Sequence, residues 1–213
     1  MIKNLVFIKI HKCSSQSVRN ILKDHAHQNE LRFFSKLKKT KEKYHKKKPL
    51  TKKYNIFALH HSYKKDFFEW LIEDPIYITF IREPLERAIS HYYYYDIHQN
   101  KNNKKSFNDF FKENPMFRQN FMSSYMGYSS LKDITIQNLN KRYKFIGITE
   151  KFDESIIKLE QVLDWNIPKP YKIKNTNYST LKNLNDPSEI KHIFKKYNAI
   201  DYKLYDLISR TFY

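Results

Sequence analysis

The chain has 213 residues, of which 40% are hydrophobic and 16% aromatic, a content that excludes an intrinsically disordered protein. Its 40 Lys and Arg residues against 22 Asp and Glu give a formal net charge of +18, which indicates either an anionic partner or a general solubility bias. With two glycines in the whole chain, a glycine-rich phosphate loop is excluded, because such a loop needs several residues at positive φ.

The compartment and the domain count follow from the same composition. Cys13 is the single cysteine, so an internal disulfide is impossible and a reducing compartment is expected. Residues 1–4 lead into a short apolar run without the pattern of a signal peptide, and no window approaches the length of a membrane span. We expect a cytoplasmic protein with one domain, residues 1–213, whose basic face could contact a membrane surface.

The first predicted elements are a strand, a loop and a helix. Residues 5–10 form an apolar run typical of a buried strand, and Val18, Ile21 and Leu22 then recur with helical spacing. Ser14 or Ser15 is a suitable N-cap for that helix. Residues 32–53 are dominated by lysine, and we interpret them as a solvated insertion within the domain.

Two further strands are predicted in the next part of the chain. Residues 55–59 form one strand, and residues 76–81, β-branched and apolar throughout, form another that is covered on both faces. A helix over residues 66–72 separates them, and Pro84 begins a helix that runs to about residue 95.

The sequence pattern of the second half of the chain predicts mostly helices. Ser106 caps a short Phe-rich helix, a helix over 117–126 ends near Gly127, a strand covers 143–149, and helices follow over 152–163, 186–196 and 199–210. Strands that alternate with helices predict a three-layer α/β domain around a central, mostly parallel sheet.

Polar side chains follow three of the predicted strands. His11 and Lys12 come after the first strand, His60 and His61 after the second, and Arg82 after the third. Ligands of parallel α/β sheets bind beyond the carboxyl ends of the strands. We therefore expect these five side chains to converge on one edge of the sheet.

The loop after the first strand has the features of an anion site. The N-terminus of a helix presents N–H groups and the positive end of its dipole, and Lys12 adds a mobile charge. The hydroxyls of Ser14, Ser15 and Ser17 add donors. Taken by itself, the same loop is more typical of a serine-capped helix with an exposed lysine.

A cysteine-dependent phosphatase is a competing interpretation of this loop. Cys13 and Arg19 have the C-x5-R spacing of enzymes in which a thiolate at a helix N-terminus attacks phosphorus. The absence of glycine from the loop argues against this hypothesis. The histidines have no metal-ligand spacing, so no metal site is predicted.

The segment after the third strand contains a second group of charged residues. Arg82 follows the strand directly, and Ser90 lies two helical turns further along. An arginine and a serine that reach one anion are a known form of phosphate recognition. In the alternative interpretation, Glu83 and Glu86 pair with Arg87 on a solvated helix face.

Residues 7–18 and 78–90 together resemble the carbohydrate sulfotransferases that use 3′-phosphoadenosine-5′-phosphosulfate (PAPS). The branch that contains the galactose 3-O- and the heparan or uronyl 2-O-sulfotransferases is most similar. Segments 58–63, 120–127 and 145–150 also resemble family segments, and they occur in the family's order.

This resemblance implies a function for individual residues. A P-loop-like strand–loop–helix would hold the 5′-phosphosulfate through Lys12, Cys13, Ser14, Ser15, Gln16 and Ser17. Arg82 and Ser90 would hold the 3′-phosphate, and Lys174 would belong to a late loop near the nucleotide. His61 would be the catalytic base, with His60 as the reserve or an orienting neighbour, and Lys12 would neutralise the leaving phosphate.

The implied reaction transfers the sulfuryl group of PAPS in line to a hydroxyl of a carbohydrate acceptor, which could be a glycan, a glycolipid or a surface polysaccharide. No nucleic acid is then expected as a partner. Two rival hypotheses remain: the cysteine phosphatase, and a non-enzymatic basic module that binds nucleic acid or polysaccharide through the lysine-rich insertion.

Overall fold

A computed structural model describes residues 4–35, 54–94, 106–113, 119–167 and 187–211. Most of the lysine-rich insertion and Lys174 lie outside these residues. The described chain contains a five-stranded sheet with the order β2-β3-β1-β4-β5, in which every adjacent pair is parallel. The strands are β1 (Leu5–Ile8), β2 (Phe33–Phe34), β3 (Ile56–Leu59), β4 (Ile76–Ile81) and β5 (Tyr143–Ile148). The predicted fold class is confirmed.

The three central strands are buried on both faces, which is why they read as continuous apolar runs. All residues of β1 and β3 are buried, and β1 pairs through Leu5 with Ile56 on one side and Ile76 on the other. Thr79 is a polar residue within β4, and its hydroxyl donates to the Ile8 carbonyl at 2.9 Å. That hydrogen bond allows the hydroxyl to be buried at low cost.

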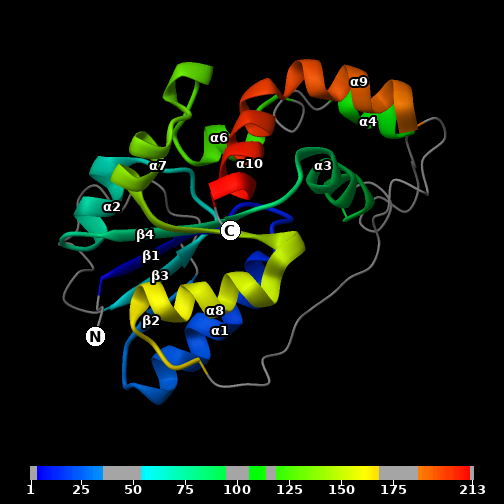
Figure 1. Cartoon of the computed structure of the whole chain (residues 1–213). Coiled ribbons are helices and arrows are strands. Elements are labelled where there is room, and N and C mark those ends of the chain that lie inside the picture. The colour runs from blue at the N-terminus through cyan, green and yellow to red at the C-terminus, as the bar shows by residue number, and fades with distance from the viewer. Residues whose placement is uncertain (1–3, 36–53, 95–105, 114–118, 168–186, 212–213) are drawn as a thin grey trace.

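Helices cover both faces of the sheet, as Figure 1 shows. The helices α1 (Ser15–Gln28) and α8 (Phe152–Leu163) lie on one face, and α6 (Phe121–Tyr125), α7 (Ile136–Arg142) and α10 (Ala199–Thr211) lie on the other. The remaining α-helices are α2 (Lys65–Leu71), α3 (Pro84–Tyr92), α4 (Phe107–Glu113) and α9 (Pro187–Tyr197). Aromatic and aliphatic side chains of α3, α4 and α9 form a second, smaller buried cluster.

The sequence placed most elements correctly and missed several local features. Helix α8 has the predicted bounds, whereas β1 ends at Ile8 and α3 ends at Tyr92, both earlier than predicted. Helix α6 begins at residue 121 because Asn120 adopts a left-handed conformation with φ of 47°. Strand β2, helix α7 and the 3₁₀ turns Leu131–Asp133 and Thr149–Lys151 were not predicted.

Within the described ranges, none of the helices combines the length and the apolar character that a membrane crossing requires.

Candidate functional site

The carboxyl ends of β1, β3 and β4 meet at one edge of the sheet. The Lys9 N–H donates to the Leu59 carbonyl at 2.8 Å, so pairing between β1 and β3 continues past the end of both strands. The His60 Nδ1–H donates back to the Lys9 carbonyl at 2.8 Å. On the other side of β1, β4 ends at Ile81 and is followed by Arg82. The predicted convergence of these strand ends is confirmed.

The loop between β1 and α1 obtains positive φ angles without glycine. Lys12 has φ of 67° and Ser14 has φ of 49°, on either side of Cys13. A left-handed conformation costs a non-glycine residue roughly 1–2 kcal/mol. Left-handed residues that alternate with others turn backbone N–H groups toward one point and form an anion-binding concavity. This loop therefore reaches positive φ without glycine, the residue on which glycine-rich phosphate loops depend.

The start of α1 completes this concavity. The first helical hydrogen bond runs from the Val18 N–H to the Ser14 carbonyl at 3.1 Å, so the N–H groups of Ser15 and Gln16 precede it at the positive end of the helix dipole. The first turn carries no acidic residue, and the Ser14 side chain makes no capping hydrogen bond. The Gln16 side chain instead donates to Asn20 Oδ1 at 2.9 Å. Gln16 can therefore serve an anion through its backbone.

Lys12 reaches from this loop toward the end of α3. Its Nζ lies 4.2 Å from the centroid of the Tyr94 ring. Burial, followed by the positive charge of Arg82, lowers the pKa of Lys12. The positive charge of Arg82 thus acts on the Lys12 ammonium, and both of these side chains are predicted to bind phosphate.

Cys13 and Arg19 do not form a phosphatase site. The Cys13 side chain is fully buried, with its Sγ 3.9 Å from Met122 Sδ, and burial raises the pKa of the thiol to about 12. The Arg19 guanidinium lies over the Phe33 ring and donates to Ser35 Oγ at 3.0 Å. A buried, neutral thiol whose predicted partner Arg19 is directed toward Phe33 does not fit the nucleophile of a phosphatase, so this rival hypothesis is not favoured.

The two neighbouring histidines after β3 have different environments. The His60 ring stacks on the His11 ring of the loop, with 4.1 Å between centroids and 14° between planes. The His61 ring stacks on Phe67 of α2 at 4.2 Å, and its Nδ1–H donates to the Ser62 carbonyl at 2.6 Å. His60 is thus in direct contact with the loop.

His11 is surrounded by aromatic rings. Besides His60, its ring faces the rings of His91, Phe121 and Tyr125 at 6.0–6.2 Å. Burial is the largest cause of a lowered pKa in all three histidines of this group, and nearby cationic side chains lower these pKa values further. The pKa falls to about 4 for His11, about 3 for His60 and about 2 for His91. All three rings are therefore neutral at pH 7.

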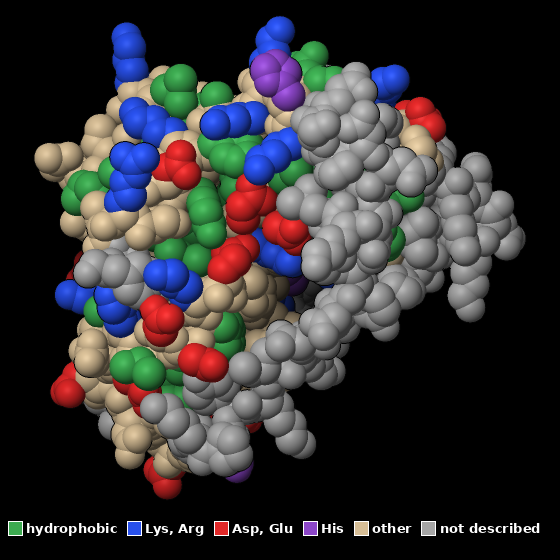
Figure 2. Space-filling model, turned by 45° about the vertical axis from the view of Figure 1, so that its right-hand side comes forward, with side chains coloured by type: hydrophobic (Ala, Val, Ile, Leu, Met, Phe, Trp, Pro, Cys, Tyr) green, Lys and Arg blue, Asp and Glu red, His purple; other side chains and the backbone are tan. Residues whose placement is uncertain are grey.

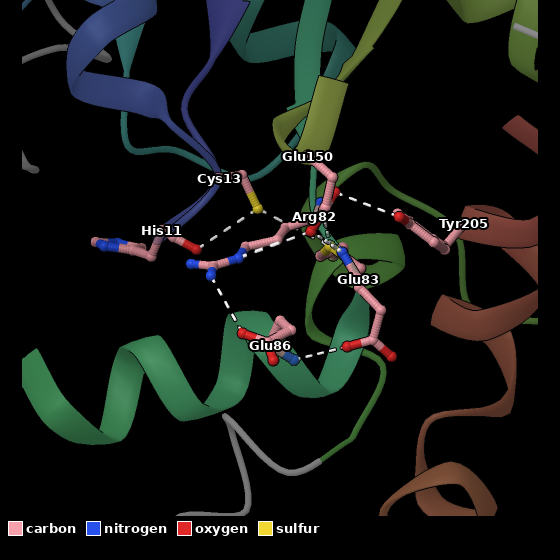
Figure 3. A network of polar contacts seen from close by, with 8 residues as sticks. His11, Cys13, Arg82, Glu83, Glu86, Glu150 and Tyr205 are labelled. Carbon is pink, nitrogen blue, oxygen red and sulfur yellow. Dashed lines mark hydrogen bonds and ion pairs between the residues drawn. The ribbon is translucent and has the colours of Figure 1, made fainter. Parts of the chain in front are cut away.

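Arg82 lies between two carboxylates, as Figure 3 shows. Its Nη2 is 3.3 Å from Glu86 Oε2, and its Nε is 3.8 Å from Glu150 Oε1. The same Glu150 oxygen accepts from the Glu83 N–H at 2.9 Å, and the second Glu150 oxygen accepts from the Tyr205 hydroxyl at 3.3 Å. The guanidinium is therefore held at the end of β4 by one carboxylate of α3 and one of the 3₁₀ turn Thr149–Lys151, and the second carboxylate is bonded in turn to Tyr205 of α10.

Ser90 and Arg87 lie on the helix that follows Arg82. Ser90 is buried one turn after Glu86, on the helix side that Arg82 contacts. Arg87 is fully buried, with its guanidinium 4.4 Å from the centroid of the Phe121 ring. The alternative in which Glu83 and Glu86 pair with Arg87 on a solvated face is therefore wrong.

The sequence did not reveal the burial of Lys9 and Arg87 or the contact of Glu150 with Arg82. Burial, helped by the charge of Arg19, lowers the pKa of Lys9 to about 8. Its position between Ile8 and Ile10, in the apolar run 5–10 that was predicted to be a buried strand, was a signal for that burial. The burial of Arg87 and the contact of Glu150 with Arg82 have no comparable signal, because both depend on helices distant in the sequence.

The described surface presents no basic stripe on the face drawn in Figure 2, where Lys and Arg side chains are interspersed with Asp and Glu. Ten lysines and one glutamate, half of the net positive charge, fall in residues 36–53, outside the described part of the chain.

A hollow of about 450 Å³ lies on α9 and α10, lined by Lys195, Ala199, Tyr202, Lys203, Asp206, Leu207 and Arg210. It shares no residue with the loop or with the ends of β3 and β4.

Comparisons with known proteins show what this chain is similar to. A family profile described as galactose-3-O-sulfotransferase matches residues 1–213. Galactose-3-O-sulfotransferase 3 of Mus musculus is 23% identical over 241 residues, which cover 98% of this chain and 56% of the mouse protein. The chain thus spans about half the length of the curated relative that it matches.

A solved structure shows the same fold. The crystal structure of mouse sulfotransferase SULT7A1 complexed with PAP matches 92% of this chain and 85% of its own chain, with a TM-score of 0.51 and 13% sequence identity. The profile match over the whole length of the chain shows the family. This chain belongs to the galactose-3-O-sulfotransferase family.

Proposed function

We propose that this chain binds PAPS across the carboxyl ends of β1 and β4 and transfers its sulfuryl group to a hydroxyl of a carbohydrate acceptor. One observation carries the proposal: a backbone anion site at residues 12–17 and a held arginine at residue 82 lie at the ends of neighbouring strands. Membership of the family supports the proposal, and so does the similar fold of a sulfotransferase that was solved with PAP.

The residues present fit a nucleotide with phosphate groups at the 5′ and the 3′ position of its ribose. The concavity at Lys12 and Ser14 with the start of α1 would hold the 5′-phosphosulfate, and Arg82 with Ser90 would hold the 3′-phosphate. Because the charge of Arg82 lowers the pKa of Lys12, an anion bound near both would relieve their repulsion. Lys174, the further predicted contact, lies outside the described residues.

When bound, PAPS supplies an activated sulfuryl group, and the protein must provide charge neutralisation and a base. Lys12 is the cation on the loop itself, and the N–H groups of Ser15 and Gln16 offer fixed dipoles beside it. Donors that are already oriented toward a developing negative charge stabilise it without reorganisation. We assign to these groups the neutralisation of the leaving 5′-phosphate.

We propose His60 as the base that takes the proton of the acceptor hydroxyl. Its Nδ1–H donates to the Lys9 carbonyl, so the neutral ring carries its lone pair on Nε2. Burial, His11 and Lys9 lower the pKa of this ring to about 3, and an anionic donor bound nearby would raise it toward a value suited to general base catalysis. His61, the base implied by the sequence resemblance, packs on Phe67 of α2 instead.

The test is transfer of labelled sulfate from PAPS to a panel of glycans that end in galactose or in other sugars. We expect product with the wild type, a fall in kcat of about 100-fold or more for His60→Ala, and less than tenfold for His61→Ala. PAP affinity of both variants should stay near the wild-type value.

Each other outcome has a defined meaning. If His61→Ala caused the larger loss, the base would be His61 and the assignment of His60 would be wrong. If the wild-type protein transferred sulfate to no glycan of the panel while it bound PAP, the carbohydrate acceptor would be wrong. If it bound no PAP, the whole proposal would be abandoned.

A further inference from the structure

The helices α6 and α10 cap each other's N-termini. The Asp201 carboxylate on α10 accepts from the Met122 N–H at 3.0 Å and from the Ser123 N–H at 2.8 Å. Its Oδ1 also accepts from the Ser123 hydroxyl at 2.7 Å. In the opposite direction, Asn120 Oδ1 accepts from the N–H groups of Ile200 and Asp201 at 2.9 and 3.3 Å. Each helix therefore satisfies the leading N–H groups of the other.

Helix α6 depends on this contact. It has five residues, which is too short for a helix to be stable by itself in water. Its N-cap residue Asn120 is left-handed and makes no side-chain capping bond to its own helix. The Asp201 side chain, 1% exposed, supplies the missing acceptor from a position 78 residues later in the chain. The orientation of α6 is thus set by α10.

The side chains of α6 contact three parts of the proposed nucleotide site. Met122 Sδ lies 3.9 Å from Cys13 Sγ in the loop and 3.5 Å from the Arg82 N–H. The Phe121 ring lies 4.4 Å from the Arg87 guanidinium. The Phe121 and Tyr125 rings both face the His11 ring. A shift of α6 would therefore move the loop and the end of β4 together.

A second residue of α10 reaches the site by another route. Tyr205 lies four residues after Asp201, on the same side of the helix. Its hydroxyl donates to Glu150, whose carboxylate contacts Arg82, as the dashed lines of Figure 3 show. One face of α10 thus contacts both α6, which packs against the loop, and Glu150, whose carboxylate contacts Arg82.

We propose that α10 sets the geometry of the nucleotide site, with Asp201 and Tyr205 as positioning residues that touch no nucleotide themselves. The inference rests on the proposed binding of PAPS and adds a determinant outside the loop and outside the segment after β4. It predicts that substitutions on this face of α10 change nucleotide affinity and selectivity, in addition to any change in stability.

Asp201→Asn tests the first route. The amide has an NH₂ group in place of one of the two acceptor oxygens, so at least one of the three hydrogen bonds is lost, and α6 should lose its fixed orientation. We expect calorimetry at a temperature where the variant is folded to show PAP affinity reduced about tenfold or more. Asp206→Asn removes the same charge from an exposed position of the same helix and should bind PAP as the wild type does.

Ser123→Ala keeps this route testable if Asp201→Asn does not fold. It removes one of the three hydrogen bonds to Asp201 and leaves both backbone donors in place. We expect a smaller loss of PAP affinity, about two- to fivefold. If either variant were folded, less heat-stable and unchanged in PAP affinity, Asp201 would be a structural residue and this part of the proposal would be overturned.

Tyr205→Phe tests the second route with the loss of a single hydroxyl. Because Glu150 acts on Arg82, the ratio of PAP affinity to AMP affinity should fall about threefold or more, while AMP affinity stays constant. An unchanged ratio would exclude Tyr205 as a positioning residue. Since every comparison is made with a wild-type protein that binds PAP, failure of this inference is distinct from failure of the proposed function, in which the wild type itself would not bind.

Discussion

The loop from His11 to Ser14 and the segment from Arg82 to Ser90 lie at neighbouring strand ends, yet they present positive charge by different means. In the loop, the left-handed residues Lys12 and Ser14 aim backbone N–H groups, and the buried side chain of Cys13 packs beneath them. In the segment after β4, the charge belongs to one side chain, Arg82, which is held by two carboxylates.

This difference determines how the loop and the segment after β4 should each respond to substitution. A site built from backbone groups depends on chain geometry and tolerates changes of its side chains, apart from Lys12. A site built from one side chain fails when that side chain is removed. The two glycines serve neither end: Gly127 provides a turn with φ of 80°, and a Cβ on Gly147 would lie 2.5 Å from the Phe80 ring.

The largest effect is expected for Lys12→Met, which removes the one mobile charge of the loop. Loss of a group that stabilises transition-state charge costs about 100- to 1000-fold in kcat. Steady-state sulfate transfer should show this loss with a much smaller change in PAP affinity. Lys23→Met, at an exposed position of α1, is the matched control. If the Lys12→Met variant had a nearly normal kcat, Lys12 would not be the group that neutralises the leaving phosphate.

Arg82→Ala should mainly affect binding. A hydrogen bond between charged groups is worth about 1.5–3 kcal/mol, so PAP affinity should fall about 10- to 150-fold, while AMP, which has no 3′-phosphate, should lose little. Calorimetry with both nucleotides measures the difference, and Arg210→Ala, an exposed arginine of α10, is the control. Equal losses for PAP and AMP would show that Arg82 does not contact the 3′-phosphate.

Cys13→Ser should cost stability and leave the chemistry intact. The variant buries a hydroxyl against Met122 in place of a thiol, which costs about 1–3 kcal/mol of unfolding free energy. Turnover of the folded variant should stay within about threefold of the wild type, because backbone groups bind the anion. Complete loss of turnover in a folded variant would contradict this prediction and indicate that Cys13 acts as a nucleophile.

The smallest effect is expected for Ser14→Gly. Glycine adopts positive φ without strain but loses more entropy on folding, so the unfolding free energy should change by less than about 1 kcal/mol. PAP affinity should stay constant because the N–H group is retained. Ser14→Val, with a β-branched side chain at the same φ of 49°, should be less stable by more than about 1 kcal/mol in chemical denaturation. Equal stability of the two variants would contradict the backbone account of the loop.

The parts of this structure that the sequence predicted are those set by local pattern. The apolar runs of β1, β3 and β4 identified buried parallel strands, and from these strands the common edge of His60, Arg82 and Lys12 followed. Helix α8 was placed at its observed bounds because its periodicity and its limits are both local.

The parts that could not be predicted depend on contacts between distant residues. Cys13, between the left-handed Lys12 and Ser14, contacts Met122, which lies 109 residues away. The burial of Arg87 requires Phe121, and the orientation of α6 requires Asp201. Strand β2 has two residues and lies at the start of a lysine-rich segment, so no run of alternating residues indicated it.

The most direct test of the account is calorimetric titration of the wild-type protein with PAP, 5′-AMP and 3′-AMP. If residues 12–17 and Arg82 bind the two phosphate groups of one nucleotide, PAP should bind with one-to-one stoichiometry and at least tenfold more tightly than either monophosphate. Binding of PAP no tighter than that of 5′-AMP would contradict a site that spans the ends of β1 and β4.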